Sequence, residues 1–244
     1  MSIPTPTLRS RRLLVIGAHA ADFVWRAAGA IALTTANSGS ASVLALSYGE
    51  RGESGELWKE PGQTVERVKQ IRHDEASRAA AVLGADFSCL DLGDYPLLMD
   101  AAAIDRLTAA IVERAPDVIT HTDRDPFNPD HPVAYAAVER ARQLASGAGV
   151  ASAFTTIRPP ELLLFEPHQP ELCGFVPTTF LDITPVFAQK EEAMAVMAAQ
   201  GYLRQYYHER AEHRANHARR ISGDQRIRYA EAFMRALPQV VGHL

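Results

Sequence analysis

The chain has 244 residues, of which 47% are hydrophobic and 22% are charged, and its formal net charge is −4 at pH 7. This length can bury a substantial core, and the acidic balance argues against a nucleic-acid partner, which usually requires a basic face. No apolar stretch approaches the length of a membrane span, and two cysteines without a CxxC pair are typical of a reduced, cytoplasmic protein.

The first 149 residues alternate short apolar runs with amphipathic segments. Apolar runs that are too short for helices predict buried strands over 13–17, 41–47, 87–92 and 118–121. Apolar residues with helical spacing predict helices over 22–38, 64–83, 101–114 and 132–145. This alternation predicts an α/β fold with a Rossmann-like, mostly parallel sheet that carries helices on both faces.

The character of the sequence changes after residue 149. Strands are predicted over 157–169 and 180–184, followed by helices over 191–200, 202–220 and 229–237. The helix over 202–220 is rich in Tyr and His, and we interpret it as a solvated face rather than a second metal site. We expect a single domain, in which residues 1–149 form the Rossmann-like core and a smaller α+β portion, residues 150–244, completes the site.

Three potential metal ligands follow predicted strands. His19 and Asp22 lie where the first strand gives way to a helix, and His131 lies in a proline-containing loop after the strand over 118–121. Ligands of open α/β sheets bind in the crevice beyond the carboxyl ends of the strands. Two imidazoles and one carboxylate suit zinc, with open positions for water and substrate. The spacing alone leaves open that the histidines are surface or capping residues.

Two loop residues are candidates for proton transfer. Glu50 lies in a glycine-rich acidic loop, residues 48–62, and His168 lies between Pro167 and Pro170. A carboxylate and an imidazole displayed in this way can accept and donate protons. Plain surface turns are the alternative interpretation for both loops.

Three arginines lie near these loops and are candidates for binding substrate carboxylates. The guanidinium group is well shaped for a carboxylate because it can donate two parallel hydrogen bonds. The alternative for any one of them is an ordinary surface arginine. The candidates are Arg51, Arg72 and Arg124.

At these residues the chain resembles the LmbE-like, or PIG-L, family of zinc-dependent deacetylases. The family's Ala-His-Pro-Asp-Asp-Glu signature corresponds to residues 18–23, and its His-Pro-Asp-His signature corresponds to residues 128–131. The resemblance implies a Rossmann-like domain with a bound Zn²⁺. It assigns the zinc ligands to His19, Asp22 and His131.

Two residues depart from the deacetylase pattern. Ala21 replaces the aspartate that serves the family as general base, and Asn128 replaces a histidine that helps to stabilise the oxyanion. A hydrolase of this kind needs a base beside its metal-bound water. These departures place ordinary deacetylation in doubt.

A narrower resemblance is to a hydratase branch of the family that serves bacterial gallate and protocatechuate breakdown. Five segments carry it, namely residues 18–27, 49–54, 93–96, 165–171 and 179–184. The resemblance implies water addition to a carbon–carbon double bond of a small tricarboxylate. Glu50 is then favoured as the base and His168 as the acid, although the two roles can be exchanged.

The same resemblance suggests that Asn128 and the three arginines contact substrate, and we expect a homo-oligomer. Two alternatives remain open. One is a zinc-dependent N-acetyl deacetylase, which Ala21 disfavours. The other is a non-catalytic binding module that retains an ancestral metal site, which the joint presence of Glu50, His168 and the three ligands disfavours.

Overall fold

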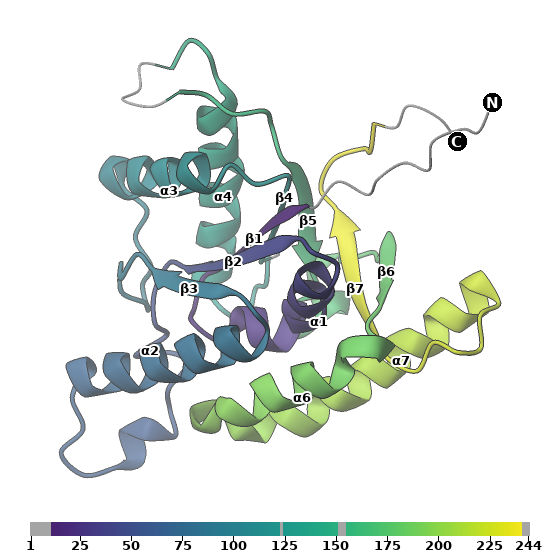
Figure 1. Ribbon diagram of the computed structural model, residues 1–244. Helices are drawn as coiled ribbons and strands as arrows, with labels where there is room; N and C mark the ends of the chain where they lie inside the picture. Colours follow the sequence, from purple (N-terminus) through teal and green to yellow (C-terminus); the bar gives the residue numbers. More distant parts are fainter. Residues whose placement is uncertain (1–10, 123, 151–154, 241–244) are drawn as a thin grey trace.

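The computed structural model describes residues 11–122, 124–150 and 155–240, and these residues form one seven-stranded sheet (Figure 1). The strand order is β3-β2-β1-β4-β5-β7-β6. Pairing is parallel from β3 to β5, whereas β7 runs antiparallel to both of its neighbours. The strands are β1 (Arg12–Gly17), β2 (Ser40–Ala45), β3 (Asp86–Cys89), β4 (Val118–His121), β5 (Glu161–Phe165), β6 (Thr179–Asp182) and β7 (Ala230–Arg235). The predicted mostly parallel α/β fold is confirmed.

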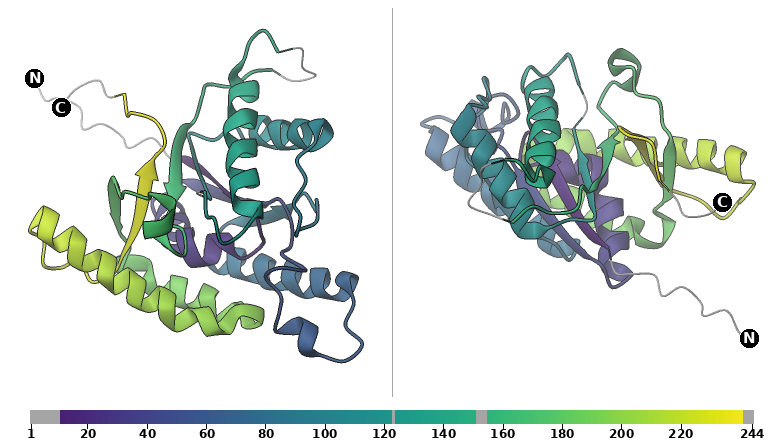
Figure 2. Two further views of the ribbon diagram at one scale, coloured as in Figure 1. Left: turned by 180° about the vertical axis from the view of Figure 1, so that it is seen from behind. Right: turned by 90° about the horizontal axis from the view of Figure 1, so that it is seen from above.

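Helices cover both faces of the sheet, as the two views of Figure 2 show. One face carries α3 (Ala101–Arg114) and α4 (Asp130–Ser146). The other carries α1 (Asp22–Ala36), α2 (Val65–Val82), α6 (Phe187–Val196) and α7 (Arg204–Ser222). Short elements complete the chain: α5 (Pro170–Cys173), η1 (Leu57–Lys59), η2 (Thr184–Val186) and η3 (Ala198–Leu203). Within the described residues, no helix is both long and apolar enough to cross a bilayer.

The central strand β1 shows why two hydrophobic clusters form. Successive side chains of a strand point to opposite faces. Val15 therefore packs in the cluster under α1, whereas Leu14 and Ile16 pack in the cluster under α3 and α4. Because both faces of β1 are covered, the strand is apolar from Leu13 onward rather than alternating.

The predicted helix over 229–237 is wrong, because these residues form strand β7. The segment Ala-Glu-Ala-Phe-Met-Arg has good helix formers, but β7 fills the position between β5 and β6 and pairs with both. Its side chains alternate: Phe233 joins the cluster under α1, and Ala232 joins a separate cluster with Leu164. Tertiary pairing thus overrides local helix propensity.

A buried ion pair ties β7 to α1. Lys190 on α6 donates to Glu231 over 2.7 Å, and both residues are at most 5% exposed. The Glu231 carboxylate also accepts from the backbone N–H groups of Gly29 and Ala30, at 2.8 and 2.9 Å, and Lys190 donates to the Trp25 carbonyl at 3.0 Å. The pair therefore joins α6 and β7 to the middle of α1.

We expect Glu231→Ala to destabilise the protein by about 3–5 kcal/mol, because it leaves the Lys190 ammonium buried without its charge partner. The free energy of unfolding in urea measures this effect. Asp224→Asn is the matched control, since it breaks an exposed pair with Arg226 and such pairs contribute little. Equal stability of the two variants would contradict the role given to the buried pair.

Candidate metal centre and active site

The three predicted metal ligands come together at one edge of the sheet. His19 and Asp22 follow β1, and His131 lies in the first turn of α4, which follows β4. β1 and β4 are parallel neighbours, so their carboxyl ends meet. The two imidazole ring centroids are 5.3 Å apart, and Asp22 Oδ1 lies 3.7 Å from His131 Nε2. All three residues are at most 2% exposed.

The donor atoms of this cluster fit a divalent metal ion. Within the described residues, His19 Nδ1 and His131 Nε2 are buried and make no hydrogen bond. The other nitrogen of each ring lies beside a carboxylate: His19 Nε2 is 3.2 Å from Asp130 Oδ2, and His131 Nδ1 is 3.4 Å from Asp125 Oδ2. A carboxylate behind a ligating histidine fixes ring orientation and leaves the opposite nitrogen for the metal.

Two glycines allow the chain to pack closely around His19. A Cβ atom on Gly17 would lie 2.8 Å from the His19 carbonyl oxygen and 3.1 Å from Asp22 Oδ2. Gly49 has φ = +69°, and a Cβ there would lie 3.2 Å from His19 Cβ. Glycine adopts this left-handed conformation without steric cost, so the loop after β2 can turn directly over the imidazole.

Glu53 is the site residue that the sequence interpretation missed. Its Oε1 lies 3.3 Å from His19 Nδ1 and 4.0 Å from His131 Nε2. Its carboxylate accepts hydrogen bonds from Asn128 Nδ2 at 2.9 Å and from Gln200 Nε2 at 3.2 Å. His19, Asp22, Glu53 and His131 can therefore offer ligand atoms to one ion. The available sequence signal was a second glutamate in the loop already singled out for Glu50.

Burial tends to raise the pKa of Glu53, but the positive charge that develops on His19, and further His131 and Arg26, outweighs burial and holds this pKa well below its usual range. The Glu53 side chain is only 17% exposed. The residue is thus ionised at neutral pH.

Glu50 lies in the same loop as Glu53, but its carboxylate lies beside Lys69 rather than beside the two imidazoles. Its Oε1 is 3.7 Å from Lys69 Nζ, the residue is 1% exposed, and neither carboxylate oxygen has a hydrogen-bond partner among the described residues. Burial, with the nearby charge of Asp94, raises the pKa of Glu50. The structure does not bring Glu50 into the cluster of His19 and His131, so the geometry gives no support to the role of base predicted for it.

The carboxylate of Asp94 holds the loop that carries Glu53. It accepts from the backbone N–H groups of Arg51, at 2.9 and 3.1 Å, and Gly52, at 2.7 Å. A Cβ on Gly52 would lie 2.0 Å from the ring of Tyr95, so any other residue there would require this ring to move. The loop after β2 and the loop after β3 are therefore fixed to each other beside the metal ligands.

His168 approaches the same sheet edge from the loop after β5, and α7 holds it there. Its Nδ1 lies 3.4 Å from the Tyr207 hydroxyl, and its ring stacks on Tyr206 with centroids 4.4 Å apart. Tyr206 and Arg210 donate hydrogen bonds to the His168 carbonyl oxygen. Burial, together with the charges of Arg26 and Arg210, lowers the pKa of His168.

The interpretation of α7 as a solvated face is corrected by these contacts. Tyr207 is 3% exposed, and Arg214 forms a two-nitrogen ion pair with Glu166, the second residue before His168. The charges that made the helix look solvated are in part directed inward. Side chains about one helical turn apart on α7 thus contact residues 166–168 and hold the segment that carries His168.

The three predicted carboxylate-binding arginines lie in different environments. Arg72 is fully buried and donates to Glu75, Gln200 and the Tyr48 carbonyl, so its expected contact with substrate is not supported. It acts within the protein, because Gln200 in turn donates to Glu53. Arg51 and Arg124 are exposed in loops at the carboxyl edge of the sheet.

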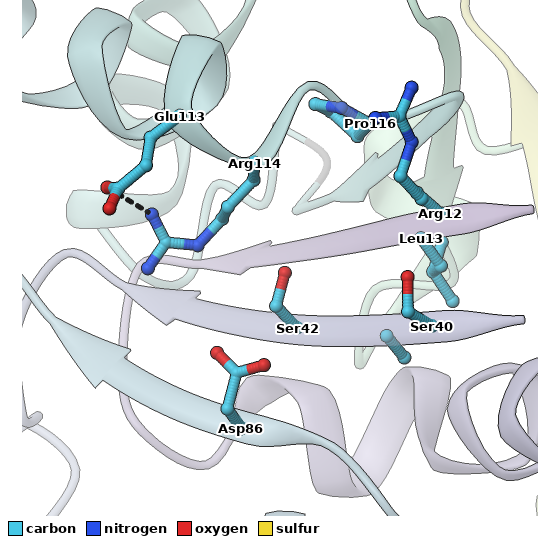
Figure 3. A pocket seen from close by; sticks show the side chains of 9 residues that line it. Arg12, Leu13, Ser40, Ser42, Asp86, Glu113, Arg114 and Pro116 are labelled. Carbon is cyan, nitrogen blue, oxygen red and sulfur yellow. Dashed lines mark ion pairs between the residues drawn. The ribbon is translucent and has the colours of Figure 1, made fainter.

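A polar cavity of about 300 Å³ lies at the opposite end of the strands (Figure 3). Its lining comes from the starts of β1, β2 and β3 and from the end of α3 with the loop that follows it, and includes Arg12, Ser40, Asp86 and Arg114. In open α/β sheets ligands bind at the other end, beyond the carboxyl ends of the strands. The cavity is therefore separate from the metal-binding cluster.

Comparison with known proteins places this geometry in context. The model of the PIG-L family, described as GlcNAc-PI de-N-acetylase, matches residues 14–142. A 4-oxalmesaconate hydratase from Pseudomonas putida is 41% identical over 235 residues, which cover 95% of this chain and 91% of that protein.

Solved structures share the whole fold. The crystal structure of GalB, the 4-carboxy-2-hydroxymuconate hydratase of Pseudomonas putida KT2440, is 40% identical with a TM-score of 0.92, over 96% of this chain and 99% of that chain. The N,N'-diacetylchitobiose deacetylase of Pyrococcus horikoshii has a TM-score of 0.74 at 17% identity, over 92% of this chain and 83% of that chain. The latter similarity concerns the fold alone.

We expect His131→Ala to lose its bound metal ion, because it removes one of two imidazole ligands from the cluster. Asp125→Asn should weaken metal affinity by about 10–100-fold, since it alters the group behind His131. Elemental analysis and competition with a chelator measure both effects. His73→Ala, at an exposed histidine, is the control. Full metal occupancy in His131→Ala would remove that residue from the ligand set.

Proposed function

The chain belongs to the PIG-L family, and we propose that it is a hydratase that adds water to 4-oxalomesaconate, or to its enol 4-carboxy-2-hydroxymuconate. The product is 4-carboxy-4-hydroxy-2-oxoadipate. The observation that carries this proposal is the 41% identity to a 4-oxalmesaconate hydratase over 95% of the chain. The enzyme is thus a hydro-lyase rather than the family's usual amidohydrolase.

The two departures from the deacetylase pattern support this function. Ala21 is fully buried and offers no base. Asn128 donates its amide to Glu53 at 2.9 Å, and its Oδ1 accepts from the Asp130 backbone N–H at 3.1 Å. An amide at this position therefore holds a carboxylate against the two imidazoles. The basic group is present in this chain, but it comes from a different loop.

The metal in this proposal is Zn²⁺, held by His19, Asp22 and His131. Two imidazoles and one carboxylate are a common zinc ligand set, with positions left for water or substrate. When bound, the ion would supply Lewis-acid stabilisation of negative charge on substrate oxygens. Arg26 donates to Asp22 Oδ1 at 3.1 Å and so holds this carboxylate in place.

Hydration requires that water lose a proton while its oxygen bonds to one carbon of the double bond, and that the neighbouring carbon gain a proton. We assign both tasks to Glu53, whose carboxylate lies beside the proposed metal and is held by Asn128 and Gln200. It takes the proton from water and, as the carboxylic acid so formed, gives that proton to the neighbouring carbon. His168 is proposed to donate a hydrogen bond to a substrate oxygen, in place of the acid role that the sequence resemblance favours for it. Arg51 and Arg124 are proposed to pair with substrate carboxylates.

Other parts of the proposal have separate grounds. A role in gallate and protocatechuate breakdown rests on the sequence resemblance, a cytoplasmic location rests on two cysteines without a CxxC pair, and assembly as a homo-oligomer is an expectation. We also propose that residues 1–149 and 150–244 act as a single domain. The second portion supplies His168 and Gln200 to the surroundings of the site, which supports a single domain.

The function is tested with enzymatically prepared 4-carboxy-2-hydroxymuconate. We expect the absorbance of the conjugated enol to disappear, with formation of a product heavier by one water molecule. The same preparation should release no acetate from an N-acetylated sugar. Acetate release without hydration would contradict the proposal and favour the deacetylase alternative.

We expect Glu53→Gln to lower kcat by about 10²–10⁴-fold, because it removes the base while keeping the size of the side chain. Steady-state kinetics and metal analysis on the same preparations separate loss of the base from loss of the metal. Glu50→Gln is the matched control from the same loop, and we expect it to keep most of its kcat. A larger loss in Glu50→Gln than in Glu53→Gln would return the role of base to Glu50.

A further inference from the structure

A chain of buried polar groups links the metal-ligand side of the site to His168. Arg26 donates through one terminal nitrogen to Asp22 Oδ1 at 3.1 Å and through Nε to the Tyr207 hydroxyl at 3.4 Å. The same hydroxyl lies 3.4 Å from His168 Nδ1. Contacts of this length in an unliganded enzyme often tighten when substrate binds. The Tyr207 hydroxyl therefore lies between the Arg26 guanidinium group and the His168 imidazole.

The direction of these hydrogen bonds follows from the number of protons available. A guanidinium group can only donate, so the Tyr207 oxygen accepts from Arg26. Tyr207 is 3% exposed, and its own hydroxyl proton needs an acceptor. Among the described residues, His168 Nδ1 is the acceptor within reach.

The opposite arrangement is less favourable. If His168 carried its proton on Nδ1, the Tyr207 oxygen would accept from both Arg26 and His168. The hydroxyl proton of Tyr207 would then be buried without an acceptor. Leaving a buried donor unsatisfied costs more than an average hydrogen bond contributes.

We propose that Tyr207 is a positioning residue that fixes His168 as the neutral imidazole with its proton on Nε2. His168 then binds a substrate oxygen as a neutral hydrogen-bond donor and keeps its proton throughout. Within the described residues, Nε2 makes no hydrogen bond to protein, so it is the nitrogen left for a ligand. The choice of a substrate oxygen rests on the proposed function, whereas the protonation state of His168 does not.

The charged and titratable groups around His168 are consistent with a neutral ring. They come from α1, α7, the loop after β2 and the loop after β4: Arg26, Tyr206, Tyr207, Arg210, Glu53 and Asp125. Burial comes first, and with the two arginine cations it outweighs the two carboxylates, which lowers the pKa of His168. Burial also raises the pKa of Tyr207, so the hydroxyl keeps the proton that it donates.

Neighbouring contacts provide a matched control for this role. Tyr206 donates to the His168 carbonyl oxygen and stacks on its ring, but it makes no hydrogen bond to a ring nitrogen. Tyr206→Phe therefore perturbs the position of the same loop and leaves the Nδ1 contact in place. Tyr207→Phe removes that contact and keeps the aromatic ring.

The test uses nitrogen NMR of the full-length, metal-loaded enzyme labelled with ¹⁵N in its histidines, without substrate at pH 7. We expect His168, identified by comparison with His168→Gln, to show a protonated Nε2 and an unprotonated Nδ1. Tyr206→Phe should keep this signature, and Tyr207→Phe should show a mixture of tautomers. A proton on Nδ1 in the unmodified enzyme, or a signature unchanged in Tyr207→Phe, would overturn the proposal.

Kinetics supply a second readout. We expect Tyr207→Phe to lower kcat on the order of tenfold, the effect of losing about one hydrogen bond, with a smaller change in KM. The unmodified enzyme should lose no activity through deprotonation of His168 as the pH rises from 6 to 8. A fall in rate that tracks His168 deprotonation by NMR would overturn the proposal. Absence of hydratase activity in the unmodified enzyme would contradict the proposed function but leave the NMR result intact.

Discussion

The site depends on a cluster of ionisable side chains buried at one sheet edge. His19, Asp22, Glu53 and His131 offer ligand atoms within 4.8 Å of one another. Burying such groups is strongly unfavourable unless they are paired, hydrogen-bonded or bound to a metal. Each therefore needs a partner on its outer side, and much of the surrounding chain provides one.

The partners of the cluster also hold the loops together. Asp130 lies behind His19 and accepts from the backbone N–H groups of Tyr95 and Leu97, at 3.0 and 2.8 Å. Asn128 joins Glu53 to the same turn. Gln200, which follows α6, connects Glu53 with Arg72. A residue behind a ligand thus has two roles, because it orients the ligand and fixes the path of a loop. Its loss would affect metal binding and loop position together.

The geometry also indicates how a deacetylase framework can carry different chemistry. In the proposed function, His19, Asp22 and His131 hold the metal, and the carboxylate beside them comes from Glu53 instead of the N-cap position of α1, which is Ala21 here. Asn128 supports this arrangement because an amide can donate to Glu53 while its oxygen accepts from Asp130. On this proposal, the base comes from a different loop than in the deacetylases, while the sheet keeps the same fold. Helix α7 orients His168 through Tyr206, Tyr207 and Arg210.

The sequence by itself determined the alternation of strands and helices in the first 149 residues and the position of His19, Asp22 and His131 after strand ends, since apolar periodicity and strand ends are local properties. It did not determine β7, because strand pairing outweighed local helix propensity. It also could not choose between Glu50 and Glu53, which lie three residues apart in one irregular loop with no periodicity to orient them. Contacts with Asp94, Asn128 and Gln200 direct one carboxylate toward the imidazoles and leave the other beside Lys69. Those contacts join residues 42 to 147 positions apart, and only the folded chain brings them together.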